Sequence, residues 1–242
     1  MPVSAVADLS NLHAIVPARG SGVGKSRLGE ALDAEERLAL VVGMLVRTLN
    51  VLAAWPGCTA IRVVTADPEL RRVVRGSDTS AVAVTESEPG TGLNAALVDG
   101  RDRASIAGAT AVLYLPADLP YLTTSALDSI LEAADAALAA GSGRPLVVLA
   151  PADARVGTNA LLLAPPTTIE PHFGESSLEA HVRAAAAADA SLQLVDDPAL
   201  GFDLDMPEDL ERLEVPLLVE LQRLGQVALD TLKSRVPSAE VA

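Results

Sequence analysis

Aromatic side chains make up only 2% of the 242 residues, and the sequence holds a single cysteine, Cys58. So few aromatic rings argue against a protein that binds single-stranded nucleic acid by stacking. One cysteine excludes an intrachain disulfide framework and a cysteine-based zinc site. We therefore expect a cytoplasmic protein built on an aliphatic core.

Positive charge is also scarce, because 18 Lys and Arg stand against 32 Asp and Glu, a formal net charge of −14. Such a field repels DNA, RNA and anionic lipid, so we expect no nucleic-acid or membrane partner. The first eleven residues lack the basic and apolar regions of a signal peptide, and no uninterrupted run of about 18 apolar residues occurs. A small anionic ligand would bind only where cations are locally concentrated.

Half of the residues are hydrophobic, and short apolar runs alternate with longer stretches of helical spacing. Up to residue 140 the expected strand–helix pairs are 12–17 with 33–55, 60–65 with 68–75, 81–85 with 93–105, and 111–116 with 123–140. This alternation predicts an α/β fold with a mostly parallel sheet and helices on both of its faces.

The pattern changes after residue 141. Two apolar strands, 145–150 and 159–164, are joined by a connection too short for a crossover helix, which predicts an antiparallel pair and hence a mixed sheet. A helix at 177–188, a strand at 192–195 and a helix at 207–213 are expected to complete the fold.

The last part of the chain is expected to be a helical appendage. We assign residues 1–213 to one domain and residues 214–242 to a C-terminal helical tail with leucines at helical spacing. This apolar stripe would pack on its own domain or on a second subunit, and the second alternative, a homodimer, is slightly favoured.

A glycine-rich turn after the first strand carries a local excess of positive charge. No acidic residue occurs between Pro17 and Gly29. Such a turn can direct several backbone N–H groups toward phosphate oxygens, and cations beside it would strengthen the binding. The candidate nucleotide-binding residues here are Arg19, Gly20, Gly22, Gly24, Lys25 and Arg27.

The same turn comes close to two named nucleotide motifs without matching either. A Walker A loop needs four residues between its two glycines, whereas three separate Gly20 from Gly24. A dinucleotide-binding G-x-G-x-x-G motif also fails, because Lys25 stands where the third glycine belongs. Both near matches indicate phosphate binding, and neither establishes a fold.

Aspartates at two distant positions suit a metal site. Asp118 follows an apolar strand, where ligands bind in open α/β sheets. Asp203 and Asp205 share one side of an extended segment because their spacing is two. Mg²⁺ commonly takes one or two carboxylates together with substrate phosphates and water. The alternative is that Asp118 and Asp205 only cap helices or turns.

A second anion site is predicted where the helix at 177–188 begins. Gly174, Ser176 and Ser177 would offer N–H groups and hydroxyls there, although Ser176 with Glu179 also fits a purely structural capping box. Thr158 and Asn159, in the turn between the two late strands, would add further donors. The histidines His13, His172 and His181 are interpreted as structural.

Taken in order, these segments resemble the 2-phospho-L-lactate guanylyltransferase family of deazaflavin coenzyme F-420 biosynthesis, which includes phosphoenolpyruvate guanylyltransferases. The resemblance covers about residues 12–213, and the tail lies outside it. The matching pieces are 15–17 with 25–28, 92–97, 115–120, 157–158, 173–174 with 176–177 and 181, and 203–210. One departure is the Gly-Ser-Gly-Val-Gly-Lys loop, where the family usually carries bulkier residues ahead of Ala-Lys.

The resemblance implies a Rossmann-like nucleotidyltransferase fold that moves GMP from GTP onto the phosphate of a three-carbon phospho-acid. It implies Mg²⁺ as cofactor, with Asp118 and Asp205 as metal-site and catalytic residues and Lys25 as a catalytic cation that contacts phosphate. The turn from Gly92 to Asn94 would lie near the nucleotide. The acceptor acid would be held by Thr158, Gly174, Ser176 and Ser177.

Such a reaction needs no Ser, Cys or His nucleophile. A phosphate monoester has a second pKa of about 6 and is already anionic at neutral pH. Catalysis would consist of positioning and charge neutralisation. Three alternatives stay open: a nucleotidyltransferase for a molybdopterin or sugar phosphate, a P-loop kinase or ATPase, and a non-catalytic nucleotide-binding module. The acceptor also stays open among phospholactate, phosphoenolpyruvate and phosphoglycerate.

Overall fold

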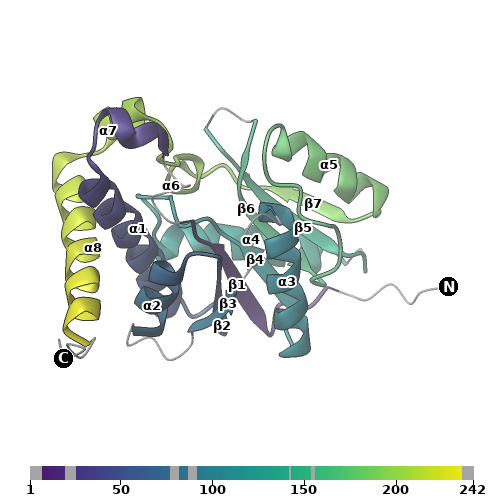
Figure 1. Cartoon of the computed structure of the whole chain (residues 1–242). Coiled ribbons are helices and arrows are strands. Elements are labelled where there is room, and N and C mark those ends of the chain that lie inside the picture. Colours follow the sequence, from purple (N-terminus) through teal and green to yellow (C-terminus); the bar gives the residue numbers. More distant parts are fainter. Residues whose placement is uncertain are drawn as a thin grey trace.

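The computed structural model describes residues 7–19, 26–76, 82–86, 92–141, 143–153 and 156–235, which form one seven-stranded sheet with helices on both faces (Figure 1). The strands are β1 Leu12–Pro17, β2 Ala60–Thr65, β3 Val82–Glu86, β4 Ala111–Tyr114, β5 Leu146–Pro151, β6 Thr158–Ala164 and β7 Ser191–Leu194. The helices are the 3-10 helix η1 Ser26–Glu30, then α1 Ala34–Ala54, α2 Pro68–Gly76, α3 Leu93–Ile106, α4 Thr124–Ala139, α5 Ser177–Ala187, α6 Pro198–Gly201, α7 Pro207–Arg212 and α8 Val215–Arg235.

The strand order across the sheet is β3-β2-β1-β4-β6-β5-β7. The first four strands of the chain pair in parallel, and β5 pairs in parallel with β7. Strand β6 runs antiparallel to both of its neighbours, with Leu161 opposite Tyr114 of β4. The predicted mostly parallel, mixed sheet is therefore confirmed. Because β6 is reversed, its first residues lie beside the carboxyl end of β4.

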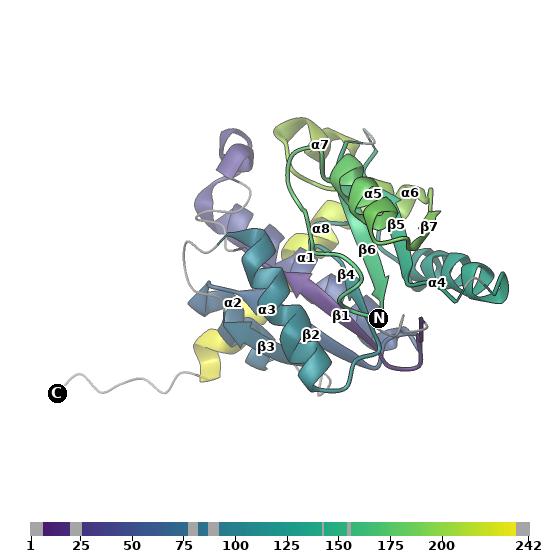
Figure 2. The ribbon, with the colours of Figure 1, turned by 90° about the vertical axis from the view of Figure 1, so that its right-hand side faces the viewer.

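Alternate residues of each buried strand face two different helix layers. In β1, Leu12, Ala14 and Val16 pack in one core cluster with residues of α1, α2 and α4, whereas Ile15 packs in a second cluster with residues of α3 and α5. In Figure 1, α1, α2 and α8 accordingly lie to the left of β1, and α3 and α5 to its right. Figure 2, turned by 90°, shows α3 and α5 in front of the sheet.

Helix α1 begins at a complete capping box. Asp33 accepts hydrogen bonds from the backbone N–H groups of Glu35 and Glu36, and the Glu36 carboxylate accepts from the Asp33 N–H. The helix is long and apolar enough to meet the length and hydropathy criteria for a membrane span, but 56% of that 18-residue window is buried inside the structure. Its apolar face packs on the sheet, as in the core helix of a folded domain.

The tail forms helix α8, which packs against α1 of the same chain (Figure 1). The two helices approach so closely that a Cβ on Gly43 would overlap the carbonyl oxygen of Leu221, and a Cβ on Gly225 would overlap that of Ala39. The leucine stripe of α8 joins the core clusters under this contact. The structure thus shows this stripe packed on its own domain, contrary to the slight preference for a second subunit, and the homodimer itself stays a prediction.

Two local features differ from the sequence-based expectation. Helix α6, capped by the Asp197 side chain through the Ala199 N–H, was missed because four residues are too few to show a helical period. The structural alternative of a capping box formed by Ser176 and Glu179 is wrong. Ser176 adopts a left-handed conformation with a φ of 56° and makes no side-chain capping bond, so its side chain does not cap α5.

Candidate active site

A cavity of about 850 Å³ opens where β1 and β4 end and β6 begins. The reversed direction of β6 is what brings its first residues to this edge. Among the sequence-predicted residues, those that line the cavity are Arg19, Arg27, Asp118, Thr158, Asn159, Gly174, Ser177, Asp203 and Asp205. Gly92, Asn94 and Ser176 are not among its lining residues, and Gly20, Gly22, Gly24 and Lys25 lie outside the described part of the chain.

The predicted aspartates meet in this cavity. The backbone N–H of Leu204 donates to the carbonyl oxygen of Asp118 at 3.0 Å, which joins the loop after β4 to the segment before α7. Leu204 is fully buried, while Asp203 and Asp205, on either side of it, both line the cavity. The prediction that these two carboxylates share one side of an extended segment is therefore confirmed.

A different carboxylate caps helix α7. Asp209 accepts hydrogen bonds from the backbone N–H groups of Asp205 at 2.9 Å and Met206 at 2.7 Å, and Met206 is the N-cap residue. The alternative in which the Asp205 side chain serves as the cap of this helix was therefore wrong. Asp209 takes this capping role, and Asp205 is among the residues that line the cavity.

Buried Asn159 fixes the segment that leads to the aspartates. Its Nδ2 lies 2.9 Å from the carbonyl oxygen of Leu200, 3.0 Å from that of Gly201 and 3.3 Å from Oδ1 of Asp203. An amide nitrogen has only two protons, so these protein acceptors occupy it fully. Asn159, expected from the sequence to be a ligand donor, is instead a positioning residue.

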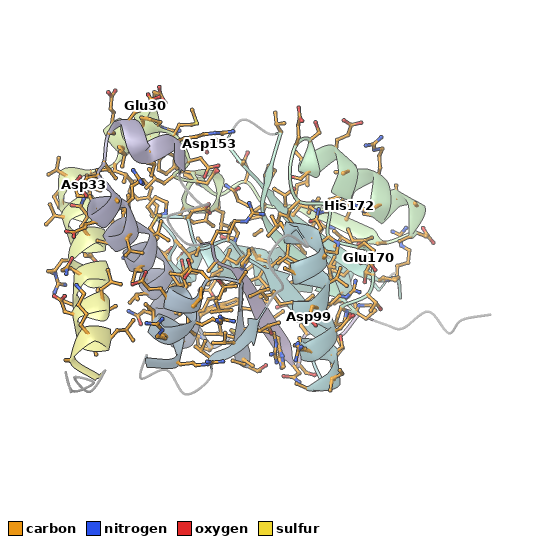
Figure 3. All side chains as sticks on the ribbon, viewed as in Figure 1. Glu30, Asp33, Asp99, Asp153, Glu170 and His172 are labelled. Carbon is orange, nitrogen blue, oxygen red and sulfur yellow. The ribbon has the colours of Figure 1, made fainter. Side chains whose placement is uncertain are left out.

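The loop after β5 is tied to the same segment. The backbone N–H of Asp153 donates to the Gly201 carbonyl at 2.8 Å, and Arg212 donates to the Asp153 carboxylate at 2.6 Å. The Arg212 guanidinium also stacks over the Phe202 ring, 4.2 Å from its centroid. Figure 3 labels Asp153 at the end of the molecule where η1 and α7 lie. This side of the cavity is therefore held by several independent contacts.

Cations line the cavity near its carboxylates. Arg19 follows β1, and Arg27 lies in η1, where its Nη1 is 3.6 Å from Sδ of Met206. Arg47 of α1 is not a lining residue, but it donates to the carbonyl oxygens of Pro120 at 3.0 Å and Leu122 at 3.4 Å. Arg47 thus holds the loop that follows Asp118, a role that the sequence did not indicate.

The predicted acceptor site is a buried hydrogen-bonded cluster. The Thr158 N–H donates to Oγ of Ser177 at 2.9 Å, and Thr158 Oγ1 lies 3.0 Å from Nδ1 of His181. The Nε2 of His181 accepts from the backbone N–H of His172 at 2.9 Å. Burial is the main cause that lowers the pKa of His181 to about 4, and the neighbouring His172 adds to it. His181 therefore stays neutral at physiological pH.

Asn94 holds the loop that carries Gly174. Its Nδ2 donates to the carbonyl oxygen of Phe173 at 3.0 Å, and its Oδ1 accepts from the Phe173 N–H at 2.8 Å. The Phe173 ring packs edge-on against Tyr114 and His181. Sequence reasoning placed Asn94 near the nucleotide, which stays a prediction. The contacts that the structure gives its amide are to this loop.

The carboxylates fit a magnesium ion that shares its ligands with a substrate. Among the residues that the structure describes, no group of three or more His, Cys, Asp or Glu side chains could hold a metal alone. Asp118 and Asp205 nevertheless offer hard oxygen donors in one cavity. This is the donor set of an ion that completes its coordination with phosphate and water oxygens.

Comparison with known proteins decides the family. Residues 12–217 match the family described as "Guanylyl transferase CofC like". The chain belongs to this family. The matched residues contain every predicted site residue and end within α8. The resemblance found in the sequence is thereby confirmed, and with it the expectation of an enzyme of the nucleotidyltransferase class.

Curated relatives cover most of the chain. A phosphoenolpyruvate guanylyltransferase of Rubrobacter xylanophilus is 40% identical over 84% of this chain and 94% of its own length. A protein of the same name from Sphaerobacter thermophilus is 36% identical over 83% of this chain and 91% of its own. A 3-phospho-D-glycerate guanylyltransferase of Phenylobacterium zucineum is 36% identical over 81% of this chain and 87% of its own.

Solved structures confirm the fold of the CofC-like chain. A putative nucleotide-diphospho-sugar transferase from Desulfovibrio desulfuricans superposes with a TM-score of 0.68 at 15% identity, over 91% of this chain and 97% of its own. A nucleotidyl transferase from Methanothermobacter superposes with a TM-score of 0.58 at 18% identity, over 87% of this chain and 99% of its own. The Rossmann-like nucleotidyltransferase fold predicted from the sequence is therefore correct.

Proposed function

We propose that the protein transfers GMP from GTP to the phosphate of phosphoenolpyruvate. An acceptor phosphate oxygen attacks the α-phosphorus of GTP, the bond from that phosphorus to the bridging oxygen breaks, and pyrophosphate leaves. The observation that carries this proposal is one cavity that brings together carboxylates, arginines and the Thr158–Ser177 hydroxyl pair. Two anionic substrates need such a cavity, because their mutual repulsion must be neutralised.

The nucleotide end of the cavity is proposed to lie between Asp118, Asp205 and the two arginines. Asp118 and Asp205 would hold Mg²⁺, which neutralises charge on the α-phosphoryl group and on the departing pyrophosphate. Arg19 and Arg27 would pair with the triphosphate oxygens. The Leu204–Asp118 and Asn159–Asp203 hydrogen bonds hold the segments that carry these carboxylates in fixed positions during the transfer.

The acceptor end is proposed to lie over Thr158, Gly174 and Ser177. Hydroxyl donors there suit the carboxylate or phosphate of a small acid, because the N–H groups of Thr158 and Ser177 already bond within the protein. Phe173, Tyr114 and Leu93 line the same cavity with apolar surface. A planar enol phosphate lies against such a surface without burying a hydroxyl, which favours phosphoenolpyruvate over 3-phospho-D-glycerate.

A second acceptor is favoured by one specific observation. A relative that is 36% identical carries the name 3-phospho-D-glycerate guanylyltransferase, so the same framework serves an acid with one more hydroxyl. We infer that both acids and 2-phospho-L-lactate belong to the acceptor class, with phosphoenolpyruvate preferred. The proposed product is the guanylylated acid used in coenzyme F-420 biosynthesis.

A substrate panel tests the proposal. Each of the four NTPs is incubated with Mg²⁺ and with phosphoenolpyruvate, 2-phospho-L-lactate, 3-phospho-D-glycerate or a hexose 1-phosphate, and pyrophosphate is measured. Release is expected with GTP and phosphoenolpyruvate, and not with GTP alone. Release only with a sugar phosphate would indicate another nucleotidyltransferase. NTP binding without release for any acceptor would indicate a non-catalytic binding module.

A further inference from the structure

A buried relay of hydrogen bonds leads from the protein backbone to the acceptor end of the cavity. It begins at the N–H of His172, passes through the imidazole of His181 and ends at the hydroxyl of Thr158. His181 is fully buried and Thr158 is 6% exposed. Figure 3 labels His172, the exposed member, near α5, the helix that carries His181.

The backbone contact fixes the tautomer of His181. A backbone N–H can only donate, so Nε2 of His181, 2.9 Å from the His172 nitrogen, must accept and carries no proton. A neutral imidazole holds one N–H, which therefore sits on Nδ1. Burial in the apolar cluster with Phe173 keeps the ring neutral. The 3.0 Å contact is thus Nδ1–H of His181 donating to Thr158 Oγ1.

This direction leaves the hydroxyl proton of Thr158 for a ligand. Thr158 Oγ1 accepts from His181, and no contact among the described residues uses its proton. Ser177 is in the same position, because its Oγ accepts from the Thr158 N–H at 2.9 Å. Both residues line the cavity. Two adjacent hydroxyls, each already supplied with a donor by the protein, are left to donate.

We propose that His181 is a positioning residue that commits Thr158, beside Ser177, to donate hydrogen bonds to the anionic end of the acceptor. The inference rests on the proposed function and deepens it. The ligand class that fits is an oxygen that only accepts, in a carboxylate or a phosphate. Such an oxygen can accept the protons of both hydroxyls without offering one of its own.

The tautomer can be measured without turnover. The chain has three histidines, so long-range ¹H–¹⁵N spectra of the imidazoles can be assigned with His13→Gln and His172→Gln variants, the second of which keeps the backbone N–H. We expect His181 to be neutral with its proton on Nδ1 at pH 7, and the Nδ1–H resonance to move when phosphoenolpyruvate is added. A proton on Nε2, or an imidazolium, would overturn the inference. This readout in the free protein is independent of whether phosphoenolpyruvate proves to be the acceptor.

Paired substitutions test the role in binding. In His181→Asn the amide nitrogen can replace Nδ1–H and still donate to Thr158, whereas in His181→Gln the amide oxygen can replace Nε2 and only the His172 contact survives. The loss of one such bond corresponds to about tenfold in the acceptor KM. We expect that rise in His181→Gln, a smaller rise in His181→Asn, and an unchanged KM for GTP in both.

A double substitution separates positioning from general structural damage. If His181 acts through the Thr158 hydroxyl, adding His181→Gln to a Thr158→Val variant should not raise the acceptor KM any further. Equal losses in the Asn and Gln variants, an additive loss in the double variant, or a matching rise in the GTP KM would overturn the inference. If the wild-type protein uses none of the phospho-acids, the proposed function is wrong. The tautomer measurement in the free protein still tests the role of His181 independently.

Discussion

The backbone N–H of Leu204 donates to the carbonyl oxygen of Asp118 at 3.0 Å, and this one bond joins the two segments on which the proposed chemistry depends. Asp118 follows β4, and Leu204 lies between Asp203 and Asp205. Neither segment is regular secondary structure. The bond therefore gives two loops the fixed separation that a shared metal and triphosphate require.

Replacement of Asp118 by Asn should abolish most of the activity. Loss of a carboxylate that is proposed to hold the metal should lower kcat by about 100-fold or more. The side chains are isosteric, so the thermal midpoint should stay near that of the wild type. Asp135→Asn on α4, an exposed position outside the cavity, makes the same charge change and should leave turnover intact. Turnover of Asp118→Asn near the wild-type level would contradict the assignment.

Turnover should require Mg²⁺, and the Mg²⁺ concentration that it needs should depend on Asp205. Chelation of divalent cations should stop pyrophosphate release, and added Mg²⁺ should restore it, because the described residues offer the ion too few ligands without substrate and water oxygens. In Asp205→Asn the Mg²⁺ concentration for half-maximal rate should rise by about tenfold. A Mg²⁺ titration measures this directly. An unchanged titration curve would place the metal elsewhere.

Loss of the Asn94 amide should weaken acceptor binding. Both of its polar atoms bond to the backbone of Phe173, next to Gly174. Removal of two part-buried hydrogen bonds corresponds to about 1–3 kcal/mol, and in Asn94→Ala we expect the acceptor KM to rise by about tenfold or more. Asn94→Asp keeps the acceptor for the Phe173 N–H and should show a smaller rise. If only the GTP KM changed, Asn94 would act at the nucleotide instead.

Stability below neutral pH should depend on His181. Its pKa falls from the ordinary 6.5 to about 4, mainly because of burial. Between these values the unfolded chain binds a proton that the folded chain does not, so the unfolding free energy decreases as pH falls from about 6.5 toward 4, by up to about 3 kcal/mol. Above pH 6.5 His181 is neutral in both states and does not change the unfolding free energy with pH.

Urea denaturation at pH 5 and pH 7.5 measures this effect. Subtraction of the His181→Gln curve from the wild-type curve isolates the contribution of His181 from that of the carboxylates. His172→Gln serves as the matched control and should keep most of the wild-type pH dependence, because it removes only the smaller of the two causes that lower the pKa of His181. An identical pH dependence in His181→Gln and the wild type would show that His181 is not buried in the neutral form.

Much of the fold was predictable because its signals are local. Short apolar runs separated by helical stretches identified β1 and β2 at their observed bounds, and the short connection after β5 indicated the antiparallel pair. Asp118 and Asp205 were predictable as partners because their residue type and their position beside strands or extended segments indicate a metal site. Each of these inferences needs only neighbours in the sequence.

The remaining features arise between distant segments. The choice of Asp209 over Asp205 as the cap of α7 depends on how the loop before that helix turns. The left-handed Ser176 lies directly before Ser177, whose Oγ accepts a hydrogen bond from Thr158 of β6. The tautomer of His181 is set by a backbone N–H from another segment. No composition or spacing rule carries that information, which is why the histidine was interpreted as structural.

The most direct test of the central claim is mass spectrometry, with phosphorus NMR, of the product formed from GTP, Mg²⁺ and phosphoenolpyruvate. The account predicts a single compound with the mass of phosphoenolpyruvate plus GMP less water, two phosphorus atoms in a diphosphate bridge, and one pyrophosphate per product. GDP with phosphate, or GTP recovered unchanged beside every phospho-acid, would contradict it.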